Sequence, residues 1–364
     1  MNIEQRINAF IELGRILDQS SISKPEAHLP TGRDEAPLAD NLHSLIKSAH
    51  HYNGWFTEEN VSFAIGAIAQ SLREENIRKW LETYKNRMGD SVQSHRIGVV
   101  MAGNIPLVGF HDFLCVLMSG NIFVGKTSSK DHKILSAVAD ALIEIAPDFK
   151  EYIEFSEEHL GNIDAIIATG SDNTSRYFEY YFGKYPNIIR RNRNSIAVID
   201  GNETQNELKE LARDIFQYFG LGCRNVSKLF VPDGYDFDKF FNAIAEYKYV
   251  TDHNKYSNNY DYCKTIYLMN QTSHLDNGFL LLKEDTKTAS PVAALFYEYY
   301  SNIEMLIKRL KSVSDNVQCI VSTREKLSKS SKLLESCIPF GQSQQPQLWD
   351  YADGVDTMSF LISL

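Results

Sequence analysis

The 364-residue chain has few cysteines, and their arrangement excludes two common kinds of domain. There are five of them, an odd number, and no two have C-x-x-C spacing: Cys115, Cys223, Cys263, Cys319 and Cys337. This pattern argues against a disulfide framework and against a zinc site built from thiolates. Because free thiols fit a reducing compartment, we expect a cytoplasmic protein.

Basic residues are also in short supply. Lysine and arginine number 37 against 47 acidic residues, which gives a formal net charge of −10. Since binding to nucleic acid needs a basic face that neutralises phosphates, we expect no nucleic-acid partner. One short basic cluster, Arg190–Arg193, is interpreted either as a solvated loop or as a contact for a ligand phosphate.

Long apolar runs are missing as well, so we expect no membrane span. Residues 1–6 carry acidic and amide side chains where a secretion signal would need a basic end and an apolar run. No internal repeat is evident. At 43% hydrophobic residues the chain is expected to be a soluble intracellular protein with a core divided over two lobes.

The first ninety residues have the periodicity of packed helices. Apolar residues recur at helical spacing over Ile3–Leu17, around Asn41–His50 and from about Thr57 onward. The proline-containing stretch between the first two, about Ser20–Asp40, predicts a linker or a wrapped loop. His43, His50 and His51 lie in this region without a carboxylate or cysteine at ligand spacing, so no metal is expected there.

From Arg96 onward, continuous apolar runs alternate with helical patterns. The runs predict strands at Ile97–Ala102, Asn121–Gly125, Ile163–Ala168 and Ser195–Ile199. Strands of this kind, each followed by a helix, are typical of a parallel sheet buried on both faces, as in α/β proteins. Ligands bind such sheets at the carboxyl ends of the strands.

Three loops follow these predicted strand ends. Asn104 follows the first strand, Lys126–Ser129 follows the second and opens a predicted helix through about Ile145, and Gly170-Ser171 follows the third. Neither G-x-G-x-x-G nor G-x-x-x-x-G-K-[ST] occurs, so the standard dinucleotide and P-loop fingerprints are absent. Taken singly, each loop is explained as well by a structural role, such as a serine that caps a helix.

The stretch Phe219–Asn225 contains the cysteine that we single out. A helical pattern that includes Leu208 ends at its glycines, and a strand pattern begins at Val226. Arg224 adds positive charge, and glycines let backbone N–H groups approach a substrate closely; both favour a reactive thiolate at Cys223. The alternative is a small buried side chain, which is the commoner role of a free cysteine.

Beyond Cys223 the pattern becomes α+β. We expect helices at Phe237–Tyr247 and about Ala293–Lys311, a polar loop over Thr251–Asp261, and strands at Thr265–Met269, Phe279–Leu282 and Val317–Val321. The glycine-punctuated tail from Phe340 onward is interpreted as a segment that closes one lobe on the other.

Four stretches together resemble motifs of the aldehyde dehydrogenase superfamily in order and spacing. They are Ala102–Leu107 (W-N-F-P-L), Gly120–Ser128 (G-N-x-V-x-K-P-S), Ala168–Ser171 (F-T-G-S) and Gly220–Cys223 (G-Q-x-C). Within that superfamily, Phe340–Gln342 and Ala352–Thr357 are similar to the end of the LuxC-type acyl-CoA reductases, a fatty-acid reductase component. The resemblance covers roughly residues 96–364.

The resemblance implies an aldehyde dehydrogenase-like α/β fold with two domains. A parallel-sheet nucleotide-binding domain, residues 1–202 and 338–364, includes the N-terminal helices, and a smaller α/β catalytic domain, residues 203–337, carries the cysteine. It also implies an NAD(P)-linked oxidoreductase that reduces a fatty acyl thioester to an aldehyde, with NADPH as cofactor and NADH as the alternative.

Site residues follow from the same resemblance. Cys223 is the implied nucleophile that takes an acyl group from acyl-CoA, and Asn104 with the Cys223 backbone N–H forms the implied oxyanion hole. Cofactor binding is implied for Lys126 and Ser128, at the adenosine ribose or its 2′-phosphate, and for Thr169, Gly170 and Ser171, at the pyrophosphate.

Two superfamily elements are altered here. Arg190–Asn194 stands where hydrolytic members have E-L-G-G-K, so no glutamate is present to activate a water, which suits an enzyme that keeps its thioester for reduction. Ser290-Pro291-Val292 retains part of E-x-F-G-P, the element at the nicotinamide ribose, but Glu284 is too far upstream to match its glutamate.

Three functions remain open from the sequence. The first is acyl-CoA reduction, the second is reduction of an acyl phosphate, and the third is a non-reducing subunit that carries acyl groups for an acyl-transferring partner protein. The acyl pocket is expected to use aromatic residues such as those in Tyr256–Tyr262, and the fold implies a homo-oligomer.

Overall fold

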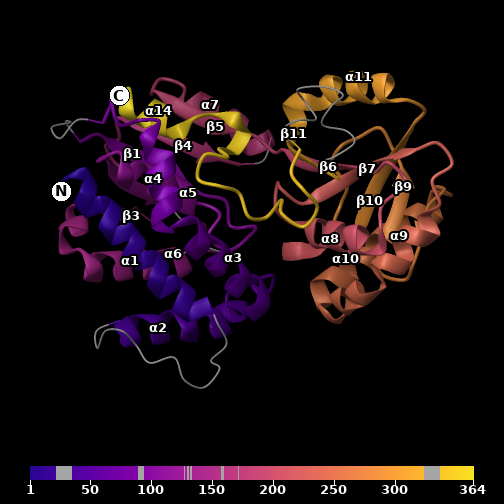
Figure 1. Ribbon diagram of the computed structural model, residues 1–364, viewed down its shortest axis with the longest axis horizontal. Helices are drawn as coiled ribbons and strands as arrows, with labels where there is room; N and C mark the ends of the chain where they lie inside the picture. The colour runs from indigo at the N-terminus through magenta and orange to yellow at the C-terminus, as the bar shows by residue number, and fades with distance from the viewer. Residues whose placement is uncertain are drawn as a thin grey trace. The chain divides into compact units, whose positions relative to one another are not determined.

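The computed structural model describes residues 1–21, 35–88, 94–126, 128, 131, 133–156, 160–170, 172–323 and 337–364. The chain divides into two compact units, each with its own sheet (Figure 1). Unit 1 comprises Met1–Arg191 and Pro346–Leu364, and unit 2 comprises Asn192–Gln345. The functional domains that the resemblance implies, with boundaries at 202/203 and 337/338, stay a prediction.

The N-terminal part of unit 1 is helical, as predicted. Its helices are α1 (Ile3–Ser21), α2 (Glu35–Ser48), the 3-10 turn η1 (Ala49–His51), α3 (Glu58–Ser71) and α4 (Glu74–Glu82). Thr57 begins α3 as its N-cap and accepts a hydrogen bond from the Asn60 N–H. The predicted start of α2 near Asn41 is wrong, because Pro37 lies in the first helical turn, where its missing N–H costs nothing.

Sheet A of unit 1 has five parallel strands in the order β3-β2-β1-β4-β5. They are β1 (Arg96–Val100), β2 (Ile122–Lys126), β3 (Ile153–Ser156), β4 (Ala165–Thr169) and β5 (Asn187–Arg190). The accompanying helices are α5 (Phe110–Met118), α6 (Lys133–Ile145), η2 (Pro147–Glu151), α7 (Asp172–Phe182), η7 (Ala352–Gly354) and α14 (Thr357–Ile362). The expected parallel α/β sheet is confirmed.

Both faces of sheet A are buried. Successive side chains of a strand point to opposite faces, so neighbouring residues pack into different clusters. Phe123 of β2 belongs to the large cluster formed with the N-terminal helices, α5 and α6. The next residue, Val124, belongs to a second cluster with Ile166 of β4 and the α7 residues Phe178 and Phe182. The continuous apolar runs of the central strands follow from this two-sided burial.

Several expectations for this region are wrong. Lys126 ends β2 and does not open a helix, since α6 begins only at Lys133. The expected strand at Ser195–Ile199 forms, but it is β6 (Asn194–Val198) of the second sheet. β3 and β5 were not predicted; they are the two edge strands, and their partly exposed residues give no continuous apolar run.

Sheet B of unit 2 has the strand order β11-β6-β7-β10-β9-β8, parallel except for β8. Besides β6, its strands are β7 (Val226–Pro232), β8 (Leu275–Asp276), β9 (Leu281–Glu284), β10 (Ala294–Tyr300) and β11 (Val317–Ser322). Its helices are α8 (Gln205–Phe216), η3 (Gln217–Gly220), α9 (Phe237–Ala243), η4 (Ala245–Asp252), α10 (Asn254–Met269), α11 (Ile303–Val313) and η5 (Ser314–Asn316).

Three of the expectations for unit 2 are wrong. The loop over Thr251–Asp261 and the strand at Thr265–Met269 are replaced largely by helix α10, because its buried tyrosines and cysteine recur at helical spacing and outweigh low helix propensity: Tyr256, Tyr260, Cys263 and Tyr267. The single helix expected over Ala293–Lys311 is instead strand β10 followed by α11, which Asn302 caps.

Across the described ranges, no helix combines the length and apolar character needed to cross a membrane. The tail is shared between the units. Residues 337–345 belong to unit 2, and residues 346–364 belong to unit 1.

Candidate active site

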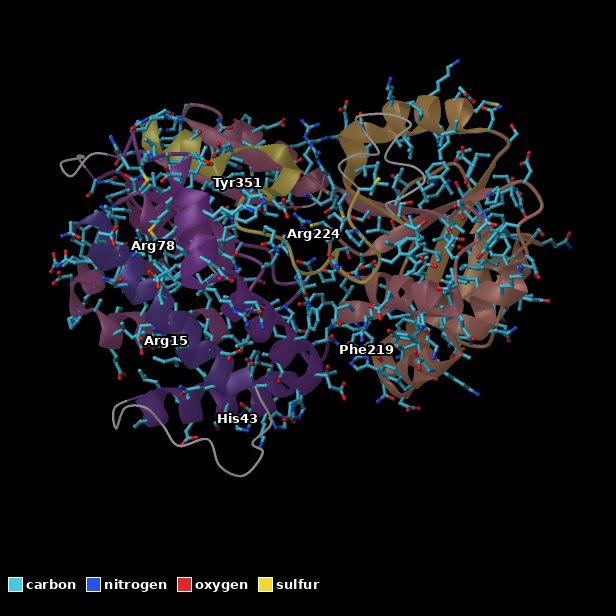
Figure 2. The ribbon with its side chains drawn as sticks, in the orientation of Figure 1. Arg15, His43, Arg78, Phe219, Arg224 and Tyr351 are labelled. Atoms are coloured by element: carbon cyan, nitrogen blue, oxygen red, sulfur yellow. The ribbon has the colours of Figure 1, made fainter. Side chains whose placement is uncertain are left out.

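The loop that carries Cys223 has an unusual backbone. Helix α8 ends at Phe216, and three residues in succession then have left-handed φ values: Tyr218 (53°), Phe219 (56°) and Gly220 (78°). Each non-glycine residue in this region costs about 1–2 kcal/mol, so the surrounding contacts must hold it there. One such contact is the ring of Phe219, which lies 4.4 Å, centroid to centroid, from that of His253 (Phe219 is labelled in Figure 2).

Cys223 itself is exposed, whereas Cys115, Cys263 and Cys337 are buried. The expectation of a small buried side chain therefore does not hold at Cys223. Its carbonyl oxygen accepts a hydrogen bond of 3.0 Å from the hydroxyl of Ser195, a fully buried residue of β6. An exposed thiol is open to solvent, which a reactive cysteine requires.

A second thiol lies beside this loop. The Cys319 sulfur is 3.0 Å from the same Ser195 hydroxyl oxygen. Burial raises the pKa of Cys319 to about 11, against the opposing charge of Arg224, which is labelled in Figure 2. Cys319 is therefore a neutral thiol at physiological pH, and Cys223 is the accessible member of the pair.

In unit 1, the loop after β1 carries Asn104, whose side chain is exposed. This loop is held at both ends. The Gly103 carbonyl accepts from the side-chain amide of Asn53 at 3.4 Å, and the Leu107 N–H donates to Asp131 at 2.8 Å. Leu107 has a left-handed φ of 56°, so its hydrogen bond to Asp131 holds an otherwise unfavourable backbone.

Asp131 is a functional candidate that sequence reasoning missed. It is 6% exposed, and burial raises its pKa to about 8, partly offset by the hydrogen bond from Leu107. Its other oxygen, Oδ1, has no hydrogen-bond partner among the residues that the structure describes. In the sequence, Asp131 stands among serines and lysines, and nothing there distinguishes it from a solvated loop residue.

Of the residues predicted to bind a cofactor, Lys126 and Thr169 end strands β2 and β4 at the carboxyl end of sheet A, and Gly170 follows Thr169. Val100 of β1 pairs with Lys126 on one side and with Ala168 on the other, so the three strands end side by side. From β1 the chain adds β2 and β3 on one side, and it then returns to add β4 and β5 on the other side. The boundary between β1 and β4 is therefore the switch point where such sheets bind nucleotides. Ser128, two residues after Lys126, is half-buried. Ser171 lies outside the described residues.

Gly170, directly after Thr169 at the end of β4, fits a phosphate site. A Cβ at this position would lie 2.9 Å from a ring carbon of Phe178 and 3.0 Å from the Cβ of Thr174. Only glycine lets the strand end pass this close to α7, whose first turn follows at Asp172. A helix N-terminus beside a glycine turn is suited to an anion such as a pyrophosphate.

The basic cluster divides between exposed and buried residues: Arg191 and Asn192 are exposed outside any helix or strand, as the solvated-loop interpretation expects, whereas Arg190 is not. The residue ends β5, is 6% exposed, and is neither part of a solvated loop nor open to a ligand phosphate. Its guanidinium binds both oxygens of Asp112, at 2.5 and 2.8 Å, and the hydroxyl of Thr357 at 3.0 Å. The position that resembles the hydrolytic glutamate therefore holds a buried cation with its own carboxylate.

The model of one protein family, described as acyl-CoA reductase (LuxC), matches residues 57–254, more than half of the chain. The protein belongs to the LuxC acyl-CoA reductase family. This places it among oxidoreductases and confirms the resemblance drawn from the motifs. No curated protein sequence matches the chain.

Solved structures similar to this LuxC-family chain are aldehyde dehydrogenases. Aldehyde dehydrogenase 21 from Physcomitrella patens, solved with succinate, has a TM-score of 0.64 at 12% identity, covering 99% of this chain and 87% of its own. Lactaldehyde dehydrogenase from Escherichia coli has 0.60 at 12%, covering 93% and 83%. Aldehyde dehydrogenase KauB from Pseudomonas aeruginosa has 0.60 at 12%, covering 92% and 78%. At these identities the likeness shows the fold, as the sequence predicted.

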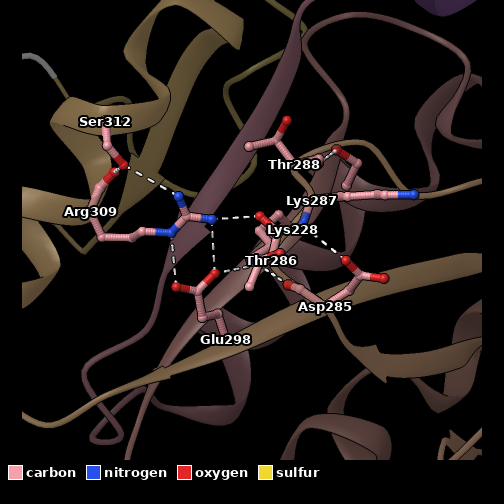
Figure 3. Close-up of polar contacts among 9 residues, drawn as sticks. Lys228, Asp285, Thr286, Lys287, Thr288, Glu298, Arg309 and Ser312 are labelled. Carbon is pink, nitrogen blue, oxygen red and sulfur yellow. Dashed lines mark hydrogen bonds and ion pairs between the residues drawn. The ribbon is translucent and has the colours of Figure 1, made fainter.

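Ser290-Pro291-Val292, the stretch that resembles part of E-x-F-G-P, lies in the connection from β9 to β10, and a partly buried ion network holds the first residues of that connection (Figure 3). Lys228 of β7, with no exposed side-chain surface, donates to the Asp285 carbonyl and binds Glu298 at 2.8 Å. Arg309 binds Glu298 at 2.9 Å and donates to the Thr286 carbonyl at 2.5 Å. Two successive carbonyls are thereby fixed by cations that sequence reasoning did not select.

Proposed function

We propose that this LuxC-family enzyme reduces a fatty acyl thioester to an aldehyde, with NADPH as reductant and a covalent acyl-cysteine at Cys223. The observation that carries the proposal is the exposed thiol of Cys223 on a strained, tightly held loop, beside a second thiol that burial keeps neutral. Strain that the surrounding structure maintains is characteristic of active sites.

In the acyl transfer, the Cys223 thiolate adds to the thioester carbonyl carbon, and the C–S bond to coenzyme A then breaks. The leaving thiolate takes a proton and departs, so that the acyl group remains on Cys223. The Asn104 amide and the Cys223 backbone N–H donate hydrogen bonds to the oxyanion. One such donor is typically worth about 3 kcal/mol in the transition state.

In the reduction, a bound reduced nicotinamide supplies a hydride to the acyl carbon. The Cys223–acyl bond then breaks, the aldehyde leaves, and the sulfur returns to the thiolate for the next cycle. Lys126, Ser128, Thr169, Gly170 and Ser171 hold the cofactor in this proposal. The register of β1 with β2 and β4 and the crowding around Gly170 support it.

Competition from hydrolysis is weak in this proposal because of Arg190. A hydrolytic enzyme needs a carboxylate to take a proton from water at the acyl-enzyme stage. Here the corresponding position is a buried arginine committed to Asp112 and Thr357. The acyl-enzyme therefore persists until hydride arrives.

The test is a turnover assay with long-chain acyl-CoA and NADPH, in which oxidation of the reduced cofactor and release of aldehyde are followed together. We expect one aldehyde per NADPH, and no reaction from Cys223→Ala. Cys319→Ala is the matched control and retains turnover. If no chain length supports oxidation of NADPH or NADH while Cys223 is intact, the proposal is wrong.

Two further measurements separate the remaining alternatives. Replacing acyl-CoA by an acyl phosphate in the same assay distinguishes the acyl donors. A stable acyl adduct on Cys223 without oxidation of either cofactor would instead identify a subunit that carries acyl groups for a partner protein. A homo-oligomer and a cytoplasmic location stay predictions.

A further inference from the structure

We propose that Asn225 is the positioning residue of the nucleophile, because its backbone N–H binds the peptide bond that joins Gly222 to Cys223 and its side chain ties this turn to the end of helix α8. The inference rests on the proposed role of Cys223. It assigns a function to a residue two positions further along the chain that carries no chemistry of its own.

The geometry around Gly222 is the first step. The Asn225 backbone N–H donates to the Gly222 carbonyl at 3.0 Å, which closes a turn with Cys223 and Arg224 at its centre. The Asn225 side-chain oxygen accepts from the Gly222 N–H at 2.8 Å. Both backbone polar groups of Gly222 are therefore bound by the same residue.

The planarity of the peptide bond is the second step. In a trans peptide the carbonyl and the following N–H point in opposite directions, and no described peptide of this chain is cis. Because the Gly222 carbonyl points to Asn225, the Cys223 N–H must point away from it. The Asn225 backbone N–H thus sets the direction of the N–H that is proposed to donate to the oxyanion, and the Asn225 side chain, which binds the preceding peptide through the Gly222 N–H, holds this turn in place.

The remaining contacts of Asn225 anchor the turn to a rigid element. Its side-chain nitrogen donates to the Asp214 carbonyl at 3.0 Å and to the Gln217 carbonyl at 2.8 Å, at the end of helix α8. Asn225 is 2% exposed, so these bonds have little competition from water. The Ser195 hydroxyl donates to the next carbonyl, that of Cys223.

No other amino acid makes this set of contacts with the same shape. Aspartate keeps the acceptor for the Gly222 N–H but, while it is ionised, has no donor for the helix-end carbonyls of Asp214, Ile215 and Gln217. Alanine loses every side-chain bond and leaves these three carbonyls and the Gly222 N–H without this partner. Asn225→Asp therefore removes part of the side-chain anchor of the turn, and Asn225→Ala removes all of it.

The test compares two reactions of the same thiol in the full-length protein, for wild type, Asn225→Asp and Asn225→Ala. Acylation by acyl-CoA passes through an oxyanion and needs the positioned N–H, whereas alkylation by iodoacetamide does not form an oxyanion. We expect acylation to fall about 100-fold in Asn225→Asp and further in Asn225→Ala, the loss typical of a small misplacement of a catalytic group. Alkylation of Cys223 should change by less than about 3-fold.

The exposed Asn206→Asp in α8 is the matched control and should change neither rate. If both rates fall together in Asn225→Asp, the residue acts only by keeping the loop folded, and the inference is overturned. Unchanged acylation in that variant overturns it equally. If wild type accepts no acyl group at all, the proposed function fails, and this inference fails with it. Should Asn225→Ala not fold, Asn225→Asp decides the outcome.

Discussion

The Cys223 loop of unit 2 and the Asn104 loop of unit 1 both contain unfavourable backbone conformations, and a different kind of side chain supports each of them. Each contains residues with left-handed φ, Tyr218 and Phe219 in one and Leu107 in the other. Each has a buried polar side chain that binds its backbone, Asn225 in one and Asp131 in the other. Asn225 is neutral and makes hydrogen bonds through both its oxygen and its nitrogen, whereas Asp131 is ionisable and has one oxygen without a partner among the described residues.

The difference has a consequence for pH. An amide cannot titrate, so the anchor of the Cys223 loop is the same at every pH. Burial raises the pKa of Asp131 to about 8, so the anchor of the Asn104 loop changes charge near physiological pH. Burial of Tyr52, together with the charge of Asp131, raises the pKa of Tyr52 to about 12. Tyr52 therefore supplies no proton near physiological pH.

The largest expected effect tests whether Asn104 donates a hydrogen bond to the oxyanion during acylation. Asn104→Ala should lower the rate of Cys223 acylation about 100- to 1000-fold, because one oxyanion donor is lost. The free energy of unfolding should change by less than about 0.5 kcal/mol, because the side chain is exposed. Single-turnover acylation and urea unfolding measure the two quantities. Asn162→Ala, exposed in the same unit, is the control, and acylation equal to wild type in Asn104→Ala would remove this loop from the account.

The next effect tests the ionisable anchor through stability. Since the pKa of Asp131 is raised from 3.8 to about 8, the folded protein binds more protons than the unfolded chain between these values, and stability falls as pH rises through that window. Asp131→Asn cannot ionise and keeps an acceptor for the Leu107 N–H. It should match wild type near pH 4 and exceed its stability at pH 8.5 by a few kcal/mol, on the order of what the shift in pKa represents.

Urea unfolding of both proteins at pH 5, 7 and 8.5 measures this difference. Asp140→Asn on the exposed face of α6 is the matched control and should show no pH-dependent difference from wild type. A constant difference between Asp131→Asn and wild type at all three pH values would mean that Asp131 is ionised throughout.

The smallest effect concerns Cys319, the partly buried thiol beside the Cys223 loop. Cys319→Ala should leave acylation within about 2-fold of wild type, since a thiol whose pKa is about 11 supplies no nucleophile at neutral pH. Stability should fall by about 1–2 kcal/mol through the lost contact volume. Peptide mapping after acyl-CoA treatment checks the first expectation, and a severe loss of acylation would show that the two cysteines act together.

Much of the fold could be predicted because burial leaves a pattern in the sequence. Central strands such as β2 and β4 are apolar along their length because both faces are covered. The edge strand β3 lacks that pattern. Helix α10 was mistaken for a loop and a strand because local composition favoured tyrosine and asparagine, while its packing depends on contacts elsewhere in unit 2.

The residues of the candidate site likewise fall into those that the sequence pattern indicates and those that it does not. Cys223 could be selected because its glycines and neighbouring strand are adjacent in sequence. Arg190 could not be interpreted correctly because its partners, Asp112 and Thr357, are 78 and 167 residues away. Asn225 and Asp131 were missed for a related reason: their role is to hold backbone groups of other residues, and no sequence pattern specifies that.

The most direct measurement of the central claim is mass spectrometry of the protein after treatment with long-chain acyl-CoA in the absence of reduced nicotinamide. The account predicts one acyl adduct, on the peptide that contains Cys223, which is discharged as aldehyde when NADPH is added. An adduct on another cysteine, or an adduct on Cys223 that neither NADPH nor NADH discharges, would contradict it.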